Sequence, residues 1–431
     1  MIGKNRRKRT WFAAAVLAAG SLVATSLPAH AETGVSSSEI KLGITLPLTG
    51  AASPGYNKVG DAMNAYFKYV NDNGGVYGRK ITLIQKNDEY SPTLAVAKTN
   101  ELILKDKVFA LVGALGTANH KAVAKSVGLQ RRGIPDLFIN TGFSGFTDKK
   151  LYGTTFPLFP SYYMEAKIMA EFIKDNYAGK TLGLVYQNDD FGTDAIKGFA
   201  QAGLKFDVTI PYTSGTQSAS TAQTWVSQLA AAKAQVVVMF GVTSATGPLL
   251  AVAAAARYAP QWILGSVGGD ATTLRALGVP AAVLNGAQGA SFLPSPGDTS
   301  DEYVKLFQEV NAKYNNNVAF DNNVLVGMNA GMLTVQALRA AGKNLTRKGL
   351  IRAMQTKGAS FASAGLAPLN WSRTSQVGYN GFWFGQYDAT GNMKPLAGGV
   401  VVYTTDNAKG AVVKSNFKRP AMPAKGLPTN S

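Results

Sequence analysis

Short apolar runs alternate with stretches of helical periodicity along this chain, and this alternation restricts the fold more than any other feature. Ile40, Leu42, Ile44 and Leu46 fall on one face of a strand over 40–46. After a loop rich in Gly, Pro and Ser, apolar residues recur at helical spacing until Asn73-Gly74-Gly75. Helices then separate further predicted strands, at 81–84, 108–112 and 136–139. This order is typical of a parallel, doubly wound sheet.

The same order restarts after a passage rich in Pro and aromatic residues, 152–163. A second series of strands is predicted, at 181–186, 207–211, 236–240 and 262–265. Two series of similar size predict an α/β fold with two Rossmann-like, doubly wound lobes. The remaining chain has helices and too few strands for a third sheet, so we expect it to complete the two lobes. Its predicted elements are helices near 300–314, 323–341 and 346–356 and strands at 382–387 and 399–404.

The first residues have the pattern of an export signal. A basic stretch from Lys4 to Arg9 precedes an apolar run from Trp11 to Leu27, and Ala29-His30-Ala31 follows. We therefore predict a signal peptide over 1–31, cleaved after Ala31. The general secretory route is the default, and the pair Arg6-Arg7 leaves the twin-arginine route open.

The scarcity of metal-binding and nucleophilic side chains excludes several classes of site. The chain has no Cys and two His, of which only His120 lies beyond the predicted signal. Zinc sites of the ordinary type, cysteine nucleophiles and His-based triads are therefore not expected. Without Cys there is also no lipid-anchor site, which favours a free protein in a periplasm bounded by an outer membrane. The formal net charge is +18, but the basic residues are spread along the chain, which favours a solvated basic surface over nucleic-acid binding.

Motifs for nucleotide binding and catalysis are incomplete. No GxGxxG follows a predicted strand, and the glycines of 55–60 are followed by Asp61 where a Walker loop has Lys. The segment 142–145 resembles a nucleophile elbow, but its second Gly comes one position early. Asp189 is interpreted as a helix cap and His120 as a surface or rim residue. We expect no enzymatic activity, no cofactor and no metal.

Two loops after predicted strands are suited to binding an anion. Residues 113–117 and 140–144 each follow a strand and carry small residues with a hydroxyl, Thr117 or Ser144. Ligands of doubly wound sheets bind where such loops lead into helix N-termini, whose free N–H groups suit a carboxylate. Taken alone, each loop is better explained as an ordinary Ser/Thr cap with a Gly turn.

Several segments, taken in order, resemble type I periplasmic binding proteins of the branched-chain amino acid (Leu/Ile/Val) receptor group. These segments are IKLGITLPLTG, NDNGGVYGRKITL, LVGALGT, NDDFGTDAIKGF, APLNWS and GYNGFWFGQY. The resemblance implies three chain crossovers that act as a hinge, near 153–160, 288–293 and 373–381. It implies a first lobe of 39–155 and 292–373 and a second lobe of 156–291 and 378–418. Residues 419–431, rich in Pro and Lys, are expected to form a frayed tail.

The resemblance also implies ligand-binding residues. Thr117 corresponds to the hydroxyl that binds the ligand carboxylate, with Gly142 and Ser144 as further partners of that group. Leu115 corresponds to an apolar wall. Two aromatic positions and a second-lobe hydroxyl complete the expected site, namely Tyr56, Phe191 and Thr243 or Ser244.

One departure from the family pattern concerns the ligand's amine. Amino-acid-binding members carry an acidic residue just after the strand that corresponds to 262–265, and Val267 stands there in this chain. An unpaired buried ammonium costs several kcal/mol. Either Asp270 replaces the acid, or the ligand is an aromatic or aliphatic carboxylate without an amine.

The resemblance implies a substrate-binding protein of an ABC importer, monomeric, that closes on a small carboxylate-bearing solute and docks on membrane permease subunits. A ligand-sensing module that feeds a signalling partner is the alternative.

Overall fold

The computed structural model describes Met1, residues 32–396 and residues 398–429. The predicted signal peptide and its cleavage site therefore lie, except for Met1, outside the described residues. Glu32–Ser431 form one compact unit.

Five parallel strands form the first sheet, in the order β2-β1-β3-β4-β5. β1 lies inside this sheet because Ile40, Leu42, Ile44 and Leu46 are fully buried. The strands are β1 (Glu39–Leu46), β2 (Lys80–Asn87), β3 (Ala110–Val112), β4 (Asp136–Ile139) and β5 (Thr155–Pro157). The connecting helices are α1 (Lys58–Asp72), α2 (Pro92–Asn100), α3 (Thr117–Val123) and α4 (Lys149–Tyr152). This arrangement confirms the parallel α/β character predicted for the first series.

Seven strands form the second sheet, in the order β12-β11-β10-β9-β8-β6-β7. Its strands from β10 to β7 are parallel, and β11 and β12 pair antiparallel at one edge. The strands are β6 (Leu182–Gln187), β7 (Val208–Tyr212), β8 (Val236–Phe240), β9 (Gln261–Leu264), β10 (Gln288–Ser291), β11 (Trp383–Tyr387) and β12 (Met393–Pro395). The helices are α5 (Tyr162–Asn176), α6 (Asp190–Gln201), α7 (Ala219–Ala231), α8 (Thr243–Ala255), α9 (Ala271–Ala276) and α10 (Ala281–Leu284).

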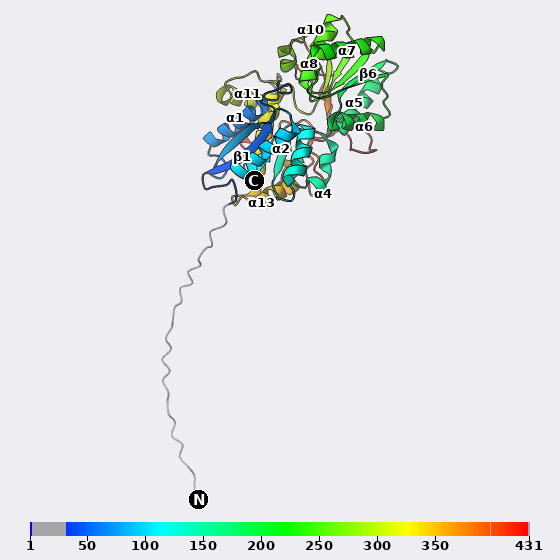
Figure 1. The fold of residues 1–431 in the computed structure, drawn as a ribbon. Helices are drawn as coiled ribbons and strands as arrows, with labels where there is room; N and C mark the ends of the chain where they lie inside the picture. Colours follow the sequence, from blue (N-terminus) through cyan, green and yellow to red (C-terminus); the bar gives the residue numbers. More distant parts are fainter. Residues whose placement is uncertain (2–31, 397, 430–431) are drawn as a thin grey trace. The chain divides into compact units, whose positions relative to one another are not determined.

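Three late helices return to the first sheet, and in Figure 1 the yellow α11 lies close to the blue α1. They are α11 (Glu302–Tyr314), α12 (Asn322–Ala341) and α13 (Arg347–Lys357). A Cβ on Gly327 would lie 2.4 Å from the Val59 carbonyl oxygen, so glycine allows α12 to pack tightly on α1. α12 is long and apolar enough to span a membrane, but 78% of its most apolar window is buried in the protein, as in a core helix.

Three segments run side by side where the chain passes between the two sheets. The Tyr379 amide donates to Leu158 O at 3.1 Å, and the Leu366 amide donates to Phe292 O at 2.8 Å. The Phe292 ring packs against both Phe159 and Tyr379. The three predicted crossover regions are thus hydrogen-bonded and packed together, as a common hinge would require.

The tail differs from the frayed end that its composition predicts. The Tyr66 hydroxyl donates to Gly426 O at 2.5 Å, and Arg419 pairs with Asp301 at 2.6 Å. Arg419 also lies over the Tyr303 ring. Residues 419–429 therefore pack on α1 and α11.

Four short strands, β5, β10, β12 and β14, were not predicted. The strand predicted over 399–404 is limited to β13 (Tyr403–Thr404), which pairs with β14 (Val413–Lys414).

Candidate functional site

A cavity of about 60 Å³ lies where strand ends of both sheets meet. From the first sheet it receives Tyr56 after β1, Leu115 to Thr117 after β3 and Asn140 after β4. From the second sheet it receives Val242 after β8, Ser266 and Val267 after β9, and the end of β10. Carboxyl ends of parallel strands are the usual ligand-binding edge of such sheets.

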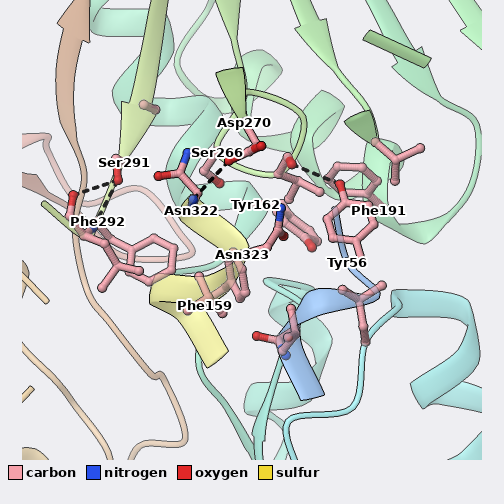
Figure 2. Close-up of a pocket in the computed structure, with 18 of the residues that line it drawn as sticks. Tyr56, Phe159, Tyr162, Phe191, Ser266, Asp270, Ser291, Phe292, Asn322 and Asn323 are labelled. Carbon is pink, nitrogen blue, oxygen red and sulfur yellow. Dashed lines mark hydrogen bonds between the residues drawn. The ribbon is translucent and has the colours of Figure 1, made fainter. Parts of the chain in front are cut away.

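The wall of the cavity is largely aromatic (Figure 2). Its aromatic members are Tyr56, Tyr90, Phe159, Tyr162, Phe191, Phe292 and Tyr387. Asp270 is the one charged residue among the described residues of the wall. The cavity therefore suits a ligand with a substantial apolar body and few polar groups.

Five of the predicted site residues lie on this wall: Tyr56, Leu115, Thr117, Phe191 and Asp270. The Tyr56 hydroxyl, from the first lobe, donates to Val267 O at 3.0 Å in the second lobe. The same oxygen accepts from the Thr243 amide at 3.3 Å and from Thr243 Oγ1 at 3.2 Å. Burial raises the pKa of Tyr56 to about 12, opposed by these bonds from Thr243. Tyr56 thus joins the two lobes as a neutral phenol.

Gly142, Ser144 and Thr243 are not on the cavity wall. The Ser144 hydroxyl and amide donate to the two carboxylate oxygens of Asp194, at 2.5 and 2.8 Å. Asp194 belongs to α6, so this contact connects the lobes. Thr243 is directed to Tyr56 in the same way. Both hydroxyls serve contacts between the lobes.

Tyr162, from the first turn of α5, covers Gly142. A Cβ on Gly142 would lie 3.0 Å from Cδ1 and Cε1 of the Tyr162 ring. Burial raises the pKa of Tyr162, and the neighbouring Gly142 amide and the Thr141 and Thr117 hydroxyls act in the opposite direction. The Tyr162 phenol therefore faces Gly142 and Thr117, two of the residues predicted to bind the ligand carboxylate.

Thr117 keeps access to the cavity at the start of α3. Its hydroxyl is 2.7 Å from that of Thr141, and the first amides of α3 have no acceptor within the helix. Of the three predicted partners of the ligand carboxylate, Thr117, Gly142 and Ser144, Thr117 is thus the one that lines the cavity.

Asp270 bridges two helix N-termini. Its Oδ1 accepts from the Thr273 amide of α9 at 2.7 Å, and its Oδ2 accepts from the Asn322 amide of α12 at 3.0 Å (Figure 2). α12 packs on α1 and β4 of the first lobe and α9 packs on α8 of the second lobe, so the carboxylate connects the lobes.

Sequence reasoning missed Asn323, in the first turn of α12. Asn323 is 7% exposed, lines the cavity, and its Nδ2 has no acceptor among the described residues. Its distance in sequence from every predicted strand end left no signal by which it could have been found.

Tyr90 was also missed, although it lies only three residues after the end of β2. Glu89 and Tyr90 both have positive φ, 51° and 62°. The Asp88 carboxylate accepts the Tyr90 amide at 2.9 Å and holds this turn. An aromatic residue just beyond a strand end was the available signal.

Two further polar residues correct or extend the sequence reading. His120 is 2% exposed and its Nε2 lies 2.5 Å from Asp136 Oδ2, so its assignment to the surface or rim was wrong. Glu165, fully buried, accepts from the amide and hydroxyl of Ser266, and burial raises its pKa to about 7.

Asp189 caps α6 as predicted, through a bond from the Phe191 amide at 2.9 Å. The residues that the structure describes contain no cluster of three or more metal-ligating side chains.

Comparison with known proteins places these features in a family. The family model described as "Periplasmic binding protein" matches residues 39–392. The Leu/Ile/Val-binding protein homolog 3 of Brucella melitensis is 26% identical over 228 residues, which are 49% of this chain and 56% of that protein. The chain thus spans little more than half the length of this curated relative.

Solved structures show the same fold. A branched-chain amino acid ABC transporter protein from Thermus thermophilus, with bound valine, has a TM-score of 0.74 and 18% identity, covering 86% of this chain and 98% of that one. A solute binding protein of an ABC transporter from R. palustris, in complex with benzoate, has a TM-score of 0.71 and 20% identity, covering 88% and 98%. Because the family model matches most of this chain, the chain belongs to the periplasmic binding protein family.

Proposed function

We propose that this protein is the periplasmic substrate-binding protein of an ABC importer and binds a small carboxylate-bearing solute between its two lobes. The observation that carries the proposal is the cavity at the strand ends of both sheets, walled by aromatic side chains. The protein would act as a monomer, without catalysis, and deliver its ligand to membrane permease subunits.

Closure about the crossovers is the proposed mechanism. The two lobes would move relative to one another about the three crossovers. The first lobe consists of 39–155 and 292–373, and the second of 156–291 and 378–418. Contacts that join the lobes around the cavity include Tyr56 with Thr243 and Val267, Ser144 with Asp194, Lys121 with Asp190, and Asp270 with the Asn322 amide. A cavity of about 60 Å³ is smaller than the ~150 Å³ that admits benzene, so a ligand of six or more carbons would enter while the lobes are apart, and side chains of the wall would shift to hold it after closure.

The ligand carboxylate would be held by neutral donors at one end of the cavity. The candidate donors are Thr117 with the first amides of α3, the Tyr162 hydroxyl and Asn323 Nδ2. Neutral donors and helix N-termini bind anions without a charged side chain.

The proposal is tested by calorimetric titration of the purified mature protein with small carboxylic acids. Thr117→Val, which removes the hydroxyl at constant volume, should weaken binding about tenfold, as expected for a lost hydrogen bond to a charged group. Thr117→Ser should bind nearly as well as the wild type. Because Thr117 also bonds Thr141, a small loss of stability is expected for the Val variant. Equal affinity of all three proteins would contradict the proposed role of Thr117, and absence of binding by any small acid would contradict the function.

A further inference from the structure

Asp270 is the one charged residue among the described residues of the wall, so it is the one carboxylate there that could pair with a ligand ammonium. In a buried site, a ligand ammonium needs a carboxylate or several acceptors to replace its hydration. The question is therefore whether Asp270 has capacity for an ammonium.

The Asp270 carboxylate is already engaged by both of its oxygens. It accepts the Thr273 amide at 2.7 Å and the Asn322 amide at 3.0 Å, and the residue is 4% exposed. Each donor stands at a helix N-terminus, where partial positive charge stabilises the carboxylate. An ammonium could reach only the lone pairs that these two amides leave free, on a carboxylate that the two helix N-termini already stabilise.

The neighbouring carboxylate, Asp321, has a cation of its own. Lys58 Nζ lies 2.5 Å from Asp321 Oδ2, and Asp321 Oδ1 caps α12 through the Val324 amide at 2.9 Å. Lys58 matches one of the two negative charges of Asp270 and Asp321, and the partial positive charges at the starts of α9 and α12 offset part of the other. The charge that remains there to attract a cationic group is therefore reduced.

The other acceptors near the cavity are engaged, with one exception: Asn140 Oδ1, on the wall, is a buried amide oxygen without a partner among the described residues. Val267 O, at the position where an acid was expected, accepts the Tyr56 hydroxyl. Glu165, behind Ser266, accepts two bonds from that residue and is buried from solvent. In contrast, Asn323 Nδ2 is a buried donor without an acceptor. Among the described residues, the buried side-chain atoms left without a partner on the wall are thus one amide donor, which suits a carboxylate, and one amide acceptor, which alone cannot replace the hydration of an ammonium.

From these contacts we infer that the ligand is an amine-free carboxylic acid with an aromatic or branched aliphatic body, and that Asp270 connects the lobes without binding a ligand ammonium. This inference rests on the proposed function and narrows it to one substrate class. The seven aromatic side chains of the wall provide the apolar surface that such a body requires.

The test uses pairs of acids that differ only in the α-amino group. 4-Methylpentanoate is compared with leucine, and 3-phenylpropanoate with phenylalanine, by calorimetry on the mature protein, with benzoate as a shorter aromatic acid and glycine betaine as a quaternary ammonium. The amine-free member of at least one pair should bind ten times more tightly or better than its amino acid. Tighter binding of leucine, phenylalanine or glycine betaine would overturn the inference and leave the proposed function standing. Binding of none of these compounds would contradict both.

Two variants separate the roles of the residues. Asp270→Asn should weaken the members of a pair by the same factor, because it loosens a contact between lobes. A loss confined to the amino acid would contradict the inference. Val267→Glu should shift the preference toward the amino acid by at least tenfold, because it places a free carboxylate on the wall. An unchanged preference in this variant would also count against the inference.

Discussion

The Tyr56 hydroxyl connects the lobes through three hydrogen bonds, so its removal should act on closure. In Tyr56→Phe, the Val267 carbonyl and the Thr243 amide lose their partner in the closed form while the ring keeps its packing. A buried polar group left without a partner costs ~1–3 kcal/mol. In an open form water would satisfy the same groups, so this cost falls on the closed form alone.

A penalty of ~1–3 kcal/mol on closure corresponds to about a 5- to 150-fold rise in Kd. Calorimetric titration with the tightest-binding acid measures this factor. Tyr258→Phe is the matched control, since the Tyr258 hydroxyl donates to Ala234 O within the second lobe at 2.7 Å. The control should lose ~1 kcal/mol of unfolding free energy and keep its Kd. An unchanged Kd in Tyr56→Phe, or an equal loss of affinity in the control, would refute the assignment of Tyr56 to closure.

Further outcomes are expected for stability. Burial raises the pKa of Glu165 from 4.5 to about 7, so the protonated carboxyl contributes fully to the free energy of unfolding below about pH 4.5. This contribution, about 3 kcal/mol, is lost as the pH rises to about 7. Glu165→Gln should therefore flatten the dependence of melting temperature on pH over this range, and an unaltered slope would contradict the raised pKa. His120→Asn should cost ~3 kcal/mol in chemical denaturation, because it disrupts the buried partner of Asp136, and a change below ~0.5 kcal/mol would show that the pair contributes little. Deletion of 419–431 should lower the unfolding free energy by about 2–4 kcal/mol, since Tyr66 and Asp301 lose their partners, whereas a frayed tail would be removed without effect.

Most of the fold could be predicted because its longer strands are apolar and buried on both faces. The runs at 136–139 and 236–240 coincide with β4 and β8. β10 was missed because Gln288–Ser291 has neither an apolar run nor an alternating pattern, and its pairing with β9 and β11 comes from tertiary context. The packing of the tail could not be predicted either, since it depends on Tyr66 and Arg419, which are distant in sequence.

The site could be predicted in part, for a related reason. Leu115 and Thr117 follow a strand directly, so the topology of a parallel sheet brings them to the ligand-binding edge. Ser144 also follows a strand, but Asp194 of the opposite lobe engages it, which local sequence does not reveal. Asn323 reaches the cavity because α12 packs on the first sheet after a crossover, so its position depends on the whole topology.

Movement of the lobes on binding is most directly measured by small-angle scattering from the mature protein, with and without a saturating amine-free acid such as 4-methylpentanoate. The account predicts a smaller radius of gyration in the presence of the acid, and a loss of this compaction in Tyr56→Phe at the same acid concentration. Identical scattering curves with and without every acid tested, together with an unchanged melting temperature, would contradict it.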